Sequence, residues 1–353
     1  MTSRFVQELS RRVLVFDGAM GTSIHQRDLD IHKDYCGCEN CTDILVKSRP
    51  DVIQEIHESF LAAGADCVET DSFGANKLVL AEFGIAPESY KLNKLAAEVA
   101  RAACDKHSTK ERPRFVVGSM GPGTRLITLG NTTWELMLES YREQARGLID
   151  GGADALIIET CQDLLQVKCA INACLAAIAD CGKSPEQVPI MVSVTIETTG
   201  TMLLGTEIAA AAAALAEYPI LSLGLNCATG PTEMAEHLHW LGKHWGAMGT
   251  PALRAGNRPV SCMPNAGLPV LVEGRTEYPL GPRPFADALL QFIERDGVRI
   301  VGGCCGTTPE HIRLLAEGVE GLRKAQGTKH NAQPEAPKPG VTSLYSVTEY
   351  RQD

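Results

Sequence analysis

The chain has 353 residues, of which 44% are hydrophobic, 22% charged and 5% aromatic, proportions typical of a globular protein with a large apolar core. Its formal net charge of −10 argues against nucleic acid or an anionic membrane surface as a partner. No apolar run approaches the roughly 18–20 residues that span a bilayer, and the polar segment 1–12 lacks the apolar core of a secretion signal, so we expect a cytoplasmic protein.

Short apolar runs alternate with amphipathic stretches along the chain, which is the pattern of repeated βα units around a parallel sheet. Eight strands are expected, and eight is the number that closes a (β/α)8 TIM barrel. A doubly wound open sheet is the alternative. In chain order the expected strands are Val13–Phe16, Cys67–Thr70, Phe115–Ser119, Ala155–Glu159, Ile190–Thr195, Leu221–Leu225, Pro259–Met263 and Val298–Val301.

The segments between these strands show helical periodicity. In Asp51–Ala63, apolar residues recur every third or fourth position and form one face, which predicts an amphipathic helix. The preceding Pro50 is typical of a helix start. Further helices are predicted over Thr133–Ile149 and over the alanine-rich Ile208–Glu217.

The composition changes near the end of the chain. Residues 326–341 are polar and contain Pro334, Pro337 and Pro339, which is typical of a linker. We therefore expect a barrel domain over residues 1–325 and a linker or tail over 326–353. The last eleven residues become more apolar again, as at the approach to a further domain.

Thirteen cysteines are many for such a chain, and in a reducing compartment they should be buried thiols, metal ligands or nucleophiles. The strongest pattern is the vicinal pair Cys304 and Cys305, with glycines on both sides that let the backbone turn. Cys227 follows a strand two places away around a barrel. Three thiolates favour Zn²⁺ with one coordination position left open. The alternative is three ordinary buried thiols.

Two acidic residues also stand at strand ends. Asp17 and Glu159 would lie at the mouth of a barrel, and Gly18 and Gly21 permit a tight turn whose amides could hold a carboxylate. Together these groups suit a zwitterionic amino acid. Alternatively, each acid caps the helix that follows it. Cys36, Cys38 and Cys41 are close enough in sequence for an accessory metal, but no fourth ligand of familiar spacing follows them.

Six motifs, in order over residues 10 to about 325, resemble the homocysteine S-methyltransferase family. They are Asp17-Gly18-Ala19-Met20-Gly21-Thr22, Glu69-Thr70-Asp71-Ser72-Phe73, Gly121-Pro122-Gly123-Thr124, Ile158-Glu159-Thr160-Cys161, Gly224-Leu225-Asn226-Cys227 and Gly303-Cys304-Cys305-Gly306. Within the family, segments 195–203 and 264–269 are similar to the homocysteine-binding modules of cobalamin-dependent methionine synthases.

The resemblance implies a (β/α)8 barrel that binds one Zn²⁺ per chain at its mouth. The zinc ligands, through which the site is catalytic, would be Cys227, Cys304 and Cys305. Asn265 matches a family residue near the metal, which implies that it would fill the fourth position when substrate is absent. The residues that the resemblance implies for substrate binding are Asp17, Gly18, Ala19, Ser72, Glu159 and Asn265.

The same resemblance implies that a methyl group passes to the thiolate of homocysteine and gives methionine. The donor would be methylcobalamin, supplied ultimately by 5-methyltetrahydrofolate and held by cobalamin- and folate-binding domains in cis or in trans. Two alternatives remain open. One is a self-contained methyltransferase using S-methylmethionine, S-adenosylmethionine or betaine, and the other is a non-enzymatic zinc-bound scaffold.

Overall fold

Eight parallel strands form the centre of the molecule. The computed structural model describes residues 3–255, 258–272 and 274–331. Each of the eight strands overlaps one of those expected from the sequence, so the strand prediction is confirmed. They are β1 Leu14–Val15, β2 Cys67–Glu69, β3 Phe115–Met120, β4 Ala155–Cys161, β5 Ile190–Val194, β6 Ser222–Asn226, β7 Val260–Met263 and β10 Ile300–Val301.

The strands close into a barrel. Their hydrogen-bonding order is β1-β10-β7-β6-β5-β4-β3-β2, and every pair is parallel. A further parallel bridge between Phe16 and Cys67 joins β1 to β2, where the Asp66 amide donates to the Val15 carbonyl at 2.6 Å. The (β/α)8 barrel is therefore confirmed. In the alternative, an open sheet, β1 and β2 would be edge strands that are not paired with each other.

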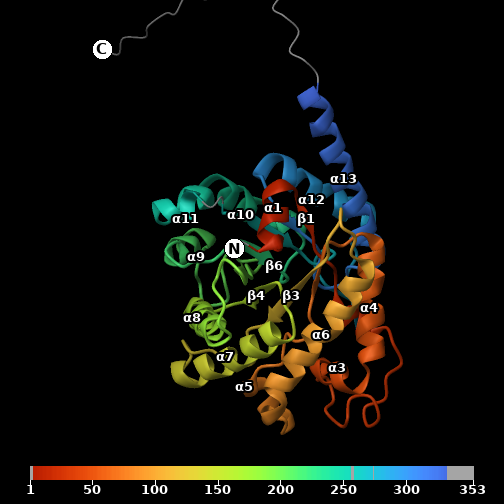
Figure 1. Ribbon diagram of the computed structural model, residues 1–353, viewed down its shortest axis with the longest axis vertical. Coiled ribbons are helices and arrows are strands. Elements are labelled where there is room, and N and C mark those ends of the chain that lie inside the picture. Colours follow the sequence, from red (N-terminus) through yellow and green to blue (C-terminus); the bar gives the residue numbers. More distant parts are fainter. Residues whose placement is uncertain (1–2, 256–257, 273, 332–353) are drawn as a thin grey trace, which may run out of the picture.

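The apolar core has an inner and an outer part because successive strand residues point to opposite faces. Leu14 and Phe16 belong to the inner cluster, whereas Val15 belongs to the cluster between the strands and the helices. Helix α1 (Arg4–Arg11) lies at the amino-terminal end of the barrel, near the centre of the ring in Figure 1. Its Phe5 and Leu9 join the inner cluster and close that end of the barrel.

Helices surround the barrel, as Figure 1 shows. The three helices expected from the sequence correspond to α4, α7 and α9 and agree within two residues at each end. Thr133 caps α7 by accepting a hydrogen bond from the Leu136 amide at 3.3 Å, and Pro50 stands in the first turn of α4. The longer helices are α4 Pro50–Ala63, α6 Ser89–His107, α7 Trp134–Asp150, α8 Leu164–Asp180, α9 Ile208–Leu215, α10 Pro231–His244, α12 Pro282–Asp296 and α13 Pro309–Asn331.

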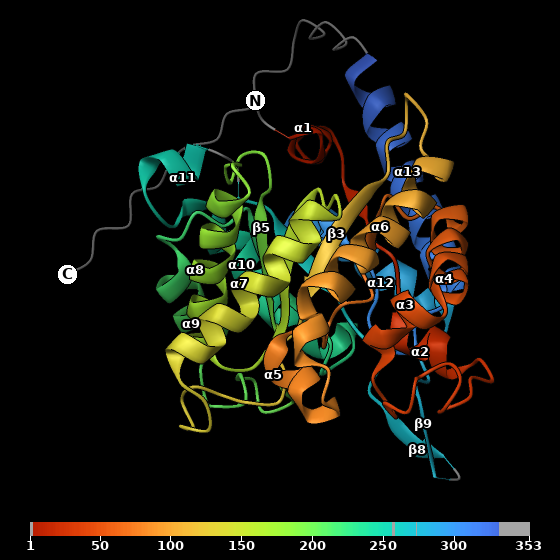
Figure 2. The ribbon, with the colours of Figure 1, turned by 60° about the horizontal axis from the view of Figure 1, so that its bottom comes forward.

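Shorter elements occupy the connections. The hairpin of β8 Val270–Val272 and β9 Arg275–Glu277 follows β7 and extends beyond the barrel (Figure 2). We did not expect this hairpin, because its strands have three residues each and are exposed on both faces. The short helices are α2 Met20–His25, η1 Thr42–Ile44, α3 Leu45–Ser48, α5 Lys77–Leu80, η2 Ala81–Phe83, η3 Ala86–Glu88, η4 Trp245–Ala247 and α11 Pro251–Ala255.

The last helix extends past the boundary drawn from the sequence. We placed the end of the barrel domain at residue 325, but α13 continues to Asn331. The rest of the expected tail, residues 332–353, lies outside the described residues. Within the part of the chain that the structure describes, none of the helices combines the length and the apolar character needed to cross a membrane.

Candidate metal centre and substrate site

Three cysteine side chains meet at the carboxyl ends of the strands. Cys227 follows β6, and Cys304 and Cys305 follow β10. The Sγ atom of Cys305 lies 3.9 Å from that of Cys227 and 3.9 Å from that of Cys304, and all three sulfurs are within 4.8 Å of one another. Among the described residues no other three His, Cys, Asp or Glu side chains gather in this way. The convergence expected from the sequence is therefore present.

The geometry of the three sulfurs fits a tetrahedral metal ion. Zn–S bonds of about 2.3 Å in a tetrahedral shell separate the sulfurs by about 3.8 Å, close to the 3.9 Å observed for two of the pairs. Soft thiolate ligands favour zinc among the common metals. The role of these residues as zinc ligands stays a prediction that their spacing supports.

The local backbone is bent to bring the sulfurs together. Cys227 and Ala228 both have φ near 56°, a left-handed conformation that costs on the order of 1 kcal/mol for residues with a Cβ. The Cys227 amide donates to the Met263 carbonyl at 3.1 Å, and the Cys304 amide donates to the Pro264 carbonyl at 2.8 Å. These bonds tie each cysteine to the loop after β7 and so stabilise the strained turn.

Hydrogen bonds concentrate negative charge on one sulfur. The thiols of Cys227 and Cys304 and the hydroxyl of Tyr278 donate to Cys305, which lowers the pKa of the Cys305 thiol. The pKa of Cys304 is raised well above its usual range, because its proton is held in the bond to Cys227 and Cys305. The group is thus already polarised toward a thiolate before a cation arrives.

Tyr278 is a site residue that sequence analysis missed. It follows β9, and its hydroxyl is hydrogen-bonded to Cys305. The ring approaches the backbone of Gly306 so closely that a Cβ there would lie 2.3 Å from the Tyr278 Cγ atom. Only glycine fits at residue 306, which explains the second glycine beside the vicinal cysteines. No pattern in the sequence indicated this contact, because it depends on the fold of the hairpin.

Asn265 lies beside the cysteines, as the resemblance implied. Its side-chain oxygen accepts a hydrogen bond from the Cys305 backbone amide at 3.1 Å, and its backbone amide donates to the Thr229 carbonyl at 3.1 Å. The structure therefore shows Asn265 positioning the Cys305 backbone. Its expected role as a fourth metal ligand stays a prediction.

Two buried carboxyl groups and one half-buried carboxyl group lie at the same end of the barrel. They belong to Asp17, which follows β1, to Glu69 in β2 and to Glu159 in β4. Both Asp17 oxygens accept from the Glu69 amide at 3.2 Å, whereas Oε1 of Glu69 has no hydrogen-bond partner among the described residues. Sequence analysis selected Asp17 and Glu159 but not Glu69, although Glu69 stands in one of the quoted motifs.

Burial determines the protonation of these groups. It raises the pKa of Glu159 to about 7, although hydrogen bonds from Ser119 and Thr160 act in the opposite direction. Burial also raises the pKa of Asp17 and of Glu69 well above their usual ranges, and the negative charge of Glu159 adds to both shifts. Carboxyl groups placed together without a cation keep protons near neutral pH. A bound ammonium group would provide the missing charge.

Glu159 is held by hydrogen bonds from side chains of strands β3 and β6. The Ser119 hydroxyl donates to its Oε1 at 2.5 Å, and the Asn226 side chain donates to its Oε2 at 3.1 Å. β4 is irregular between Ile158 and Cys161, and Thr160 has a φ of 56°. Such a bulge re-aims the side chain beside it.

Neither acid caps a helix, so that alternative is wrong. The N-cap of α8 is Asp163, which accepts from the Leu165 amide, not Glu159. Helix α2 has no side-chain cap at all. The carboxylates of Asp17 and Glu159 are bound instead to groups on neighbouring strands.

The other expected substrate contacts have partners inside the protein. Ser72 is fully buried; its hydroxyl donates to the Ser119 carbonyl at 2.8 Å, and its amide donates to the Thr70 carbonyl at 2.8 Å. The Ala19 amide donates to the Thr307 hydroxyl at 3.1 Å. A Cβ on Gly18 would lie 2.6 Å from that hydroxyl. Ser72 thus holds the backbone of Ser119, whose hydroxyl is bound to Glu159. Gly18 and Ala19 pack against the loop that carries Cys304 and Cys305.

The remaining cysteine motif does not form a metal group. Cys36 is exposed, Cys38 half-buried and Cys41 buried, and the three are absent from the clusters of close metal-binding side chains in the described chain. The accessory metal considered from their spacing is therefore not supported.

The fold and the site together define a class, namely (β/α)8 barrels with a three-thiol group at the carboxyl ends of the strands. Comparison with known families gives a match between the model of homocysteine S-methyltransferases and residues 14–319. The chain belongs to the homocysteine S-methyltransferase family, which makes it a methyltransferase. The resemblance inferred from the motifs is thereby confirmed.

Two bacterial proteins are similar over almost the whole chain. The methionine synthase of Mycobacterium leprae (strain TN) is 45% identical over 348 residues, which is 98% of this chain and 27% of that protein. The methionine synthase of Mycobacterium tuberculosis (strain ATCC 25618 / H37Rv) is 45% identical over 345 residues, with the same coverage. The chain thus spans about a quarter of the length of these relatives.

A solved structure confirms the fold. The metallated form of the homocysteine methyltransferase MmuM from Escherichia coli superposes with a TM-score of 0.67 and 24% sequence identity. The match covers 89% of this chain and 98% of that one. At this level of identity the likeness is evidence for the barrel and not for the details of the site.

Proposed function

We propose that this chain holds one zinc ion with Cys227, Cys304 and Cys305 and transfers a methyl group to the sulfur of homocysteine. The observation that carries the proposal is the placement of three thiols and three carboxyl groups, two of them buried, at the same end of one barrel. The negative charge of Cys305 also contributes to the raised pKa of Glu159. Family membership provides independent support.

The two halves of the site match the two ends of homocysteine. Zinc bound by the thiols would lower the pKa of the homocysteine thiol, so that the nucleophile is a thiolate at neutral pH. Asp17 and Glu159 bind the ammonium group, and Ser119 and Asn226 keep Glu159 in place. With the amino acid fixed in this way, its sulfur has one orientation toward the donor, which lowers the entropic part of the barrier. Methionine is a neutral thioether and leaves.

The mouth of the barrel carries an apolar rim, which favours a large methyl donor. The exposed large apolar side chains of the described chain all lie on connections that follow strands or on the first turns of the next helices. Apolar patches of this kind mark docking surfaces. The rim consists of Ile31, Phe73, Leu129, Leu136, Leu165, Leu203, Leu204, Leu268, Val270, Leu271 and Val272.

This rim favours methylcobalamin on a cobalamin-binding domain, in cis or in trans, as the donor. The methyl group would then come ultimately from 5-methyltetrahydrofolate on a folate-binding domain. The two mycobacterial relatives support the same choice, since they are methionine synthases more than three times as long as the part that matches. A self-contained enzyme acting on S-methylmethionine, S-adenosylmethionine or betaine is the second candidate.

The test is an assay of the purified chain with homocysteine and each donor in turn. Free methylcobalamin should support slow methionine formation whose rate rises roughly linearly with donor concentration, because a freely diffusing donor lacks the high local concentration that a tethered donor has. Chelation of zinc should abolish the reaction. Rapid turnover with a sulfonium or betaine donor and none with methylcobalamin would contradict the choice of donor. A chain without zinc and without homocysteine affinity would contradict the whole proposal and favour the scaffold.

A further inference from the structure

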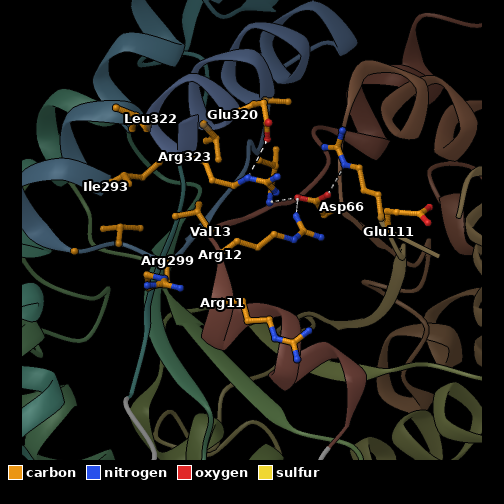
Figure 3. A pocket seen from close by; sticks show the side chains of 16 residues that line it. Arg11, Arg12, Val13, Asp66, Glu111, Ile293, Arg299, Glu320, Leu322 and Arg323 are labelled. Atoms are coloured by element: carbon orange, nitrogen blue, oxygen red, sulfur yellow. Dashed lines mark hydrogen bonds and ion pairs between the residues drawn. The ribbon is translucent and has the colours of Figure 1, made fainter. Parts of the chain in front are cut away.

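A second cavity lies at the opposite end of the barrel from the cysteines. Its walls come from α1 and the residues that precede β1, β2, β3 and β10, together with α12 and α13 (Figure 3). Its volume is about 560 Å³, within the range of small-molecule sites. The amino ends of barrel strands rarely carry catalytic groups, so a cavity of this size needs a separate explanation.

The cavity carries an excess of positive charge in an acidic protein. Five arginines line it against three acidic residues, whereas the whole chain has a formal charge of −10. The charged lining residues are Arg11, Arg12, Arg112, Arg299 and Arg323, with Asp66, Glu111 and Glu320.

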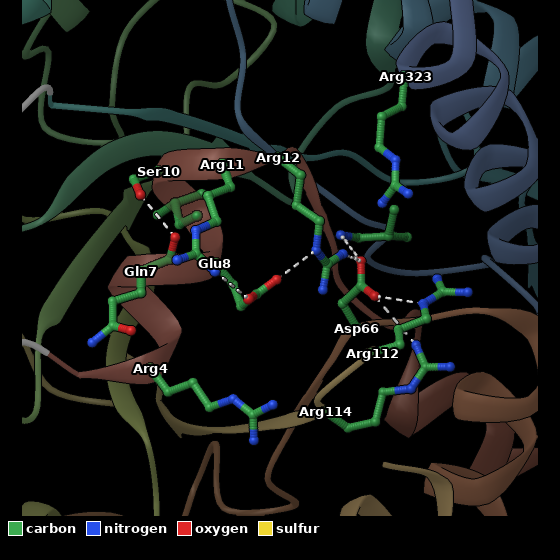
Figure 4. Close-up of polar contacts among 12 residues, drawn as sticks. Arg4, Gln7, Glu8, Ser10, Arg11, Arg12, Asp66, Arg112, Arg114 and Arg323 are labelled. Carbon is green, nitrogen blue, oxygen red and sulfur yellow. Dashed lines mark hydrogen bonds and ion pairs between the residues drawn. The ribbon is translucent and has the colours of Figure 1, made fainter. Parts of the chain in front are cut away.

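Asp66 neutralises only part of this charge. Its carboxylate is 2.8 Å from Arg12, 3.0 Å from Arg112 and 3.2 Å from Arg114, so one buried acid serves three guanidinium groups (Figure 4). Glu8 adds a second contact to Arg12 at 3.0 Å. This cluster stabilises the amino end of the barrel. Arg11 also lies 3.6 Å from Glu8, and Arg323, on the other side of the cavity, lies 3.6 Å from Glu320. Among the described residues Arg299 has no acidic partner.

Two guanidinium nitrogens of the residues that line the cavity have no hydrogen-bond partner within the described part of the chain. They are Nη2 of Arg12 and Nε of Arg299, and both atoms are buried. The only hydrogen bond that the structure gives to the Arg299 side chain runs from Nη2 to the Leu9 carbonyl at 2.9 Å, and burial lowers the pKa of Arg299. Unpaired buried donors are rare, and they often mark the place of an ion or a ligand.

The remaining wall of the cavity is apolar. It is formed by side chains from β1 and its flank and from α12 and α13, namely Val13, Val15, Ile293, Val298, Ala316, Val319 and Leu322. A site that combines a guanidinium wall with an apolar wall suits an anion with an apolar part. Guanidinium groups bind phosphate and carboxylate groups through paired N–H donors.

We propose that this cavity binds a small organic anion with at least two negative charges, of the phosphate-ester or polycarboxylate class. The anion lies between Arg12 and Arg299 at the floor of the barrel and Arg323 on α13. Because α13 contributes one wall, the bound anion links this helix to the barrel. The ligand thereby stabilises the position of α13 without contact to the cysteines at the other end.

The experiment measures binding of phenyl phosphate, citrate and pyrophosphate by calorimetry and by thermal shift, at fixed ionic strength, with acetate as the singly charged control. At least one of the three multivalent anions should bind saturably and raise the melting temperature, and acetate should not. Comparison of phenyl phosphate with citrate distinguishes the two ligand classes. Absence of saturable binding by all three anions overturns the proposal.

Variants locate the binding. The double variant Arg11→Gln/Arg323→Gln changes side chains that are 71% and 63% exposed, so folding is not threatened, and it should weaken anion binding roughly tenfold or more. Arg313→Gln is the matched control, since Arg313 lies on the same helix outside the cavity. Zinc content and homocysteine affinity should be the same in all three proteins. Equal anion affinity in the double variant and the parent chain overturns the proposal.

Discussion

At the scale of single residues, the candidate site brings together acidic groups whose proximity is unfavourable while no cation is bound between them. Three thiols share their protons, and three carboxyl groups, two of them buried, lie at the same end of the barrel without a cation. Folding energy from the rest of the barrel keeps these groups in place. Binding of a metal ion and of an ammonium group would relieve both conflicts, so the proposed site should discriminate its ligands by charge.

The first prediction concerns the cysteines. Replacement of Cys227, Cys304 or Cys305 by alanine should remove the single zinc ion, because each sulfur is one of three ligands in the one such group found among the described residues. Elemental analysis of the purified variants measures this. The exposed Cys36 provides the control, and Cys36→Ala should keep its zinc. Full zinc occupancy in the three site variants would show that the cluster is only a group of buried thiols.

The second prediction concerns Glu159. Glu159→Gln should keep its zinc but bind homocysteine more weakly, by on the order of 1.5–3 kcal/mol, because a charge-assisted bond to the ammonium is lost. In the parent chain, homocysteine affinity should fall as the pH decreases below about 7, where Glu159 becomes protonated. Calorimetry from pH 6 to 8.5 measures both effects. An unchanged dissociation constant would assign Glu159 a structural role.

The same substitution should also make the free energy of unfolding depend less on pH. The folded-state pKa of Glu159 is raised from 4.5 to about 7, so between these values the folded chain binds more protons than the unfolded chain, and the free energy of unfolding decreases as pH rises. Glu159→Gln removes this contribution and should reduce the slope. Urea denaturation of the ligand-free chain from pH 5 to 8.5 measures this slope. The control is Glu236→Gln, because Glu236 is 81% exposed. An identical slope in both variants would contradict the assignment.

At the scale of elements, the β8–β9 hairpin connects the rim to the metal centre. Together with the turn before it, the hairpin carries four of the exposed apolar residues, namely Leu268 in the turn and Val270–Val272 in β8. It also leads into Tyr278, whose hydroxyl is bound to Cys305. A donor that docks on the rim would therefore contact the hairpin that leads into Tyr278, the residue bound to the proposed zinc ligand Cys305.

The third prediction tests this connection. Tyr278→Phe should lower zinc affinity by about tenfold or more, because a hydrogen bond to a metal ligand typically contributes a factor of 10–100. Competition with a chromogenic chelator measures the affinity. Tyr218→Phe changes a half-buried tyrosine far along the chain and should have no effect. Equal zinc affinity in both variants would show that the Tyr278 hydroxyl is not a partner of Cys305.

At the scale of the whole molecule, the two ends of the barrel carry different chemical groups. The carboxyl end carries the thiols, the acids and the apolar rim, and the amino end carries the arginine cavity and α1. Phe5 of α1 packs edge to face on Phe115 with ring centroids 5.4 Å apart, so the inner core is completed by a helix that precedes the first strand. The inner core between the two ends lets either be changed without the other.

The fourth prediction uses this separation. Phe5→Ala should reduce the free energy of unfolding by about 3–5 kcal/mol, because it opens a cavity beneath the inner cluster. Zinc content should not change, since the metal centre lies at the opposite end. Urea denaturation measures the loss, and Phe73→Ala, at a 42% exposed position on the rim, should cost far less. A loss below about 1 kcal/mol would mean that α1 is not part of the barrel core.

The amino-acid sequence by itself determined the strands, the amphipathic helices and the positions of the chemical groups. Apolar residues with strand and helix periodicity specify the βα units locally, and parallel strands bring their carboxyl ends to one face. Cys227, Cys304, Asp17 and Glu159 could therefore be selected, because a position at a strand end is enough to place them at the mouth.

Only the tertiary structure decided the contacts that depend on barrel closure and on loop conformation. The bond from Tyr278 to Cys305, the unpartnered oxygen of Glu69 and the arginines around Asp66 each join segments far apart in the chain. No local pattern encodes such contacts, because they arise from the register in which β1 meets β2 and from the path of the hairpin. Periodicity fixes which face a residue takes, but the partner across a closed barrel is set by packing of the whole chain.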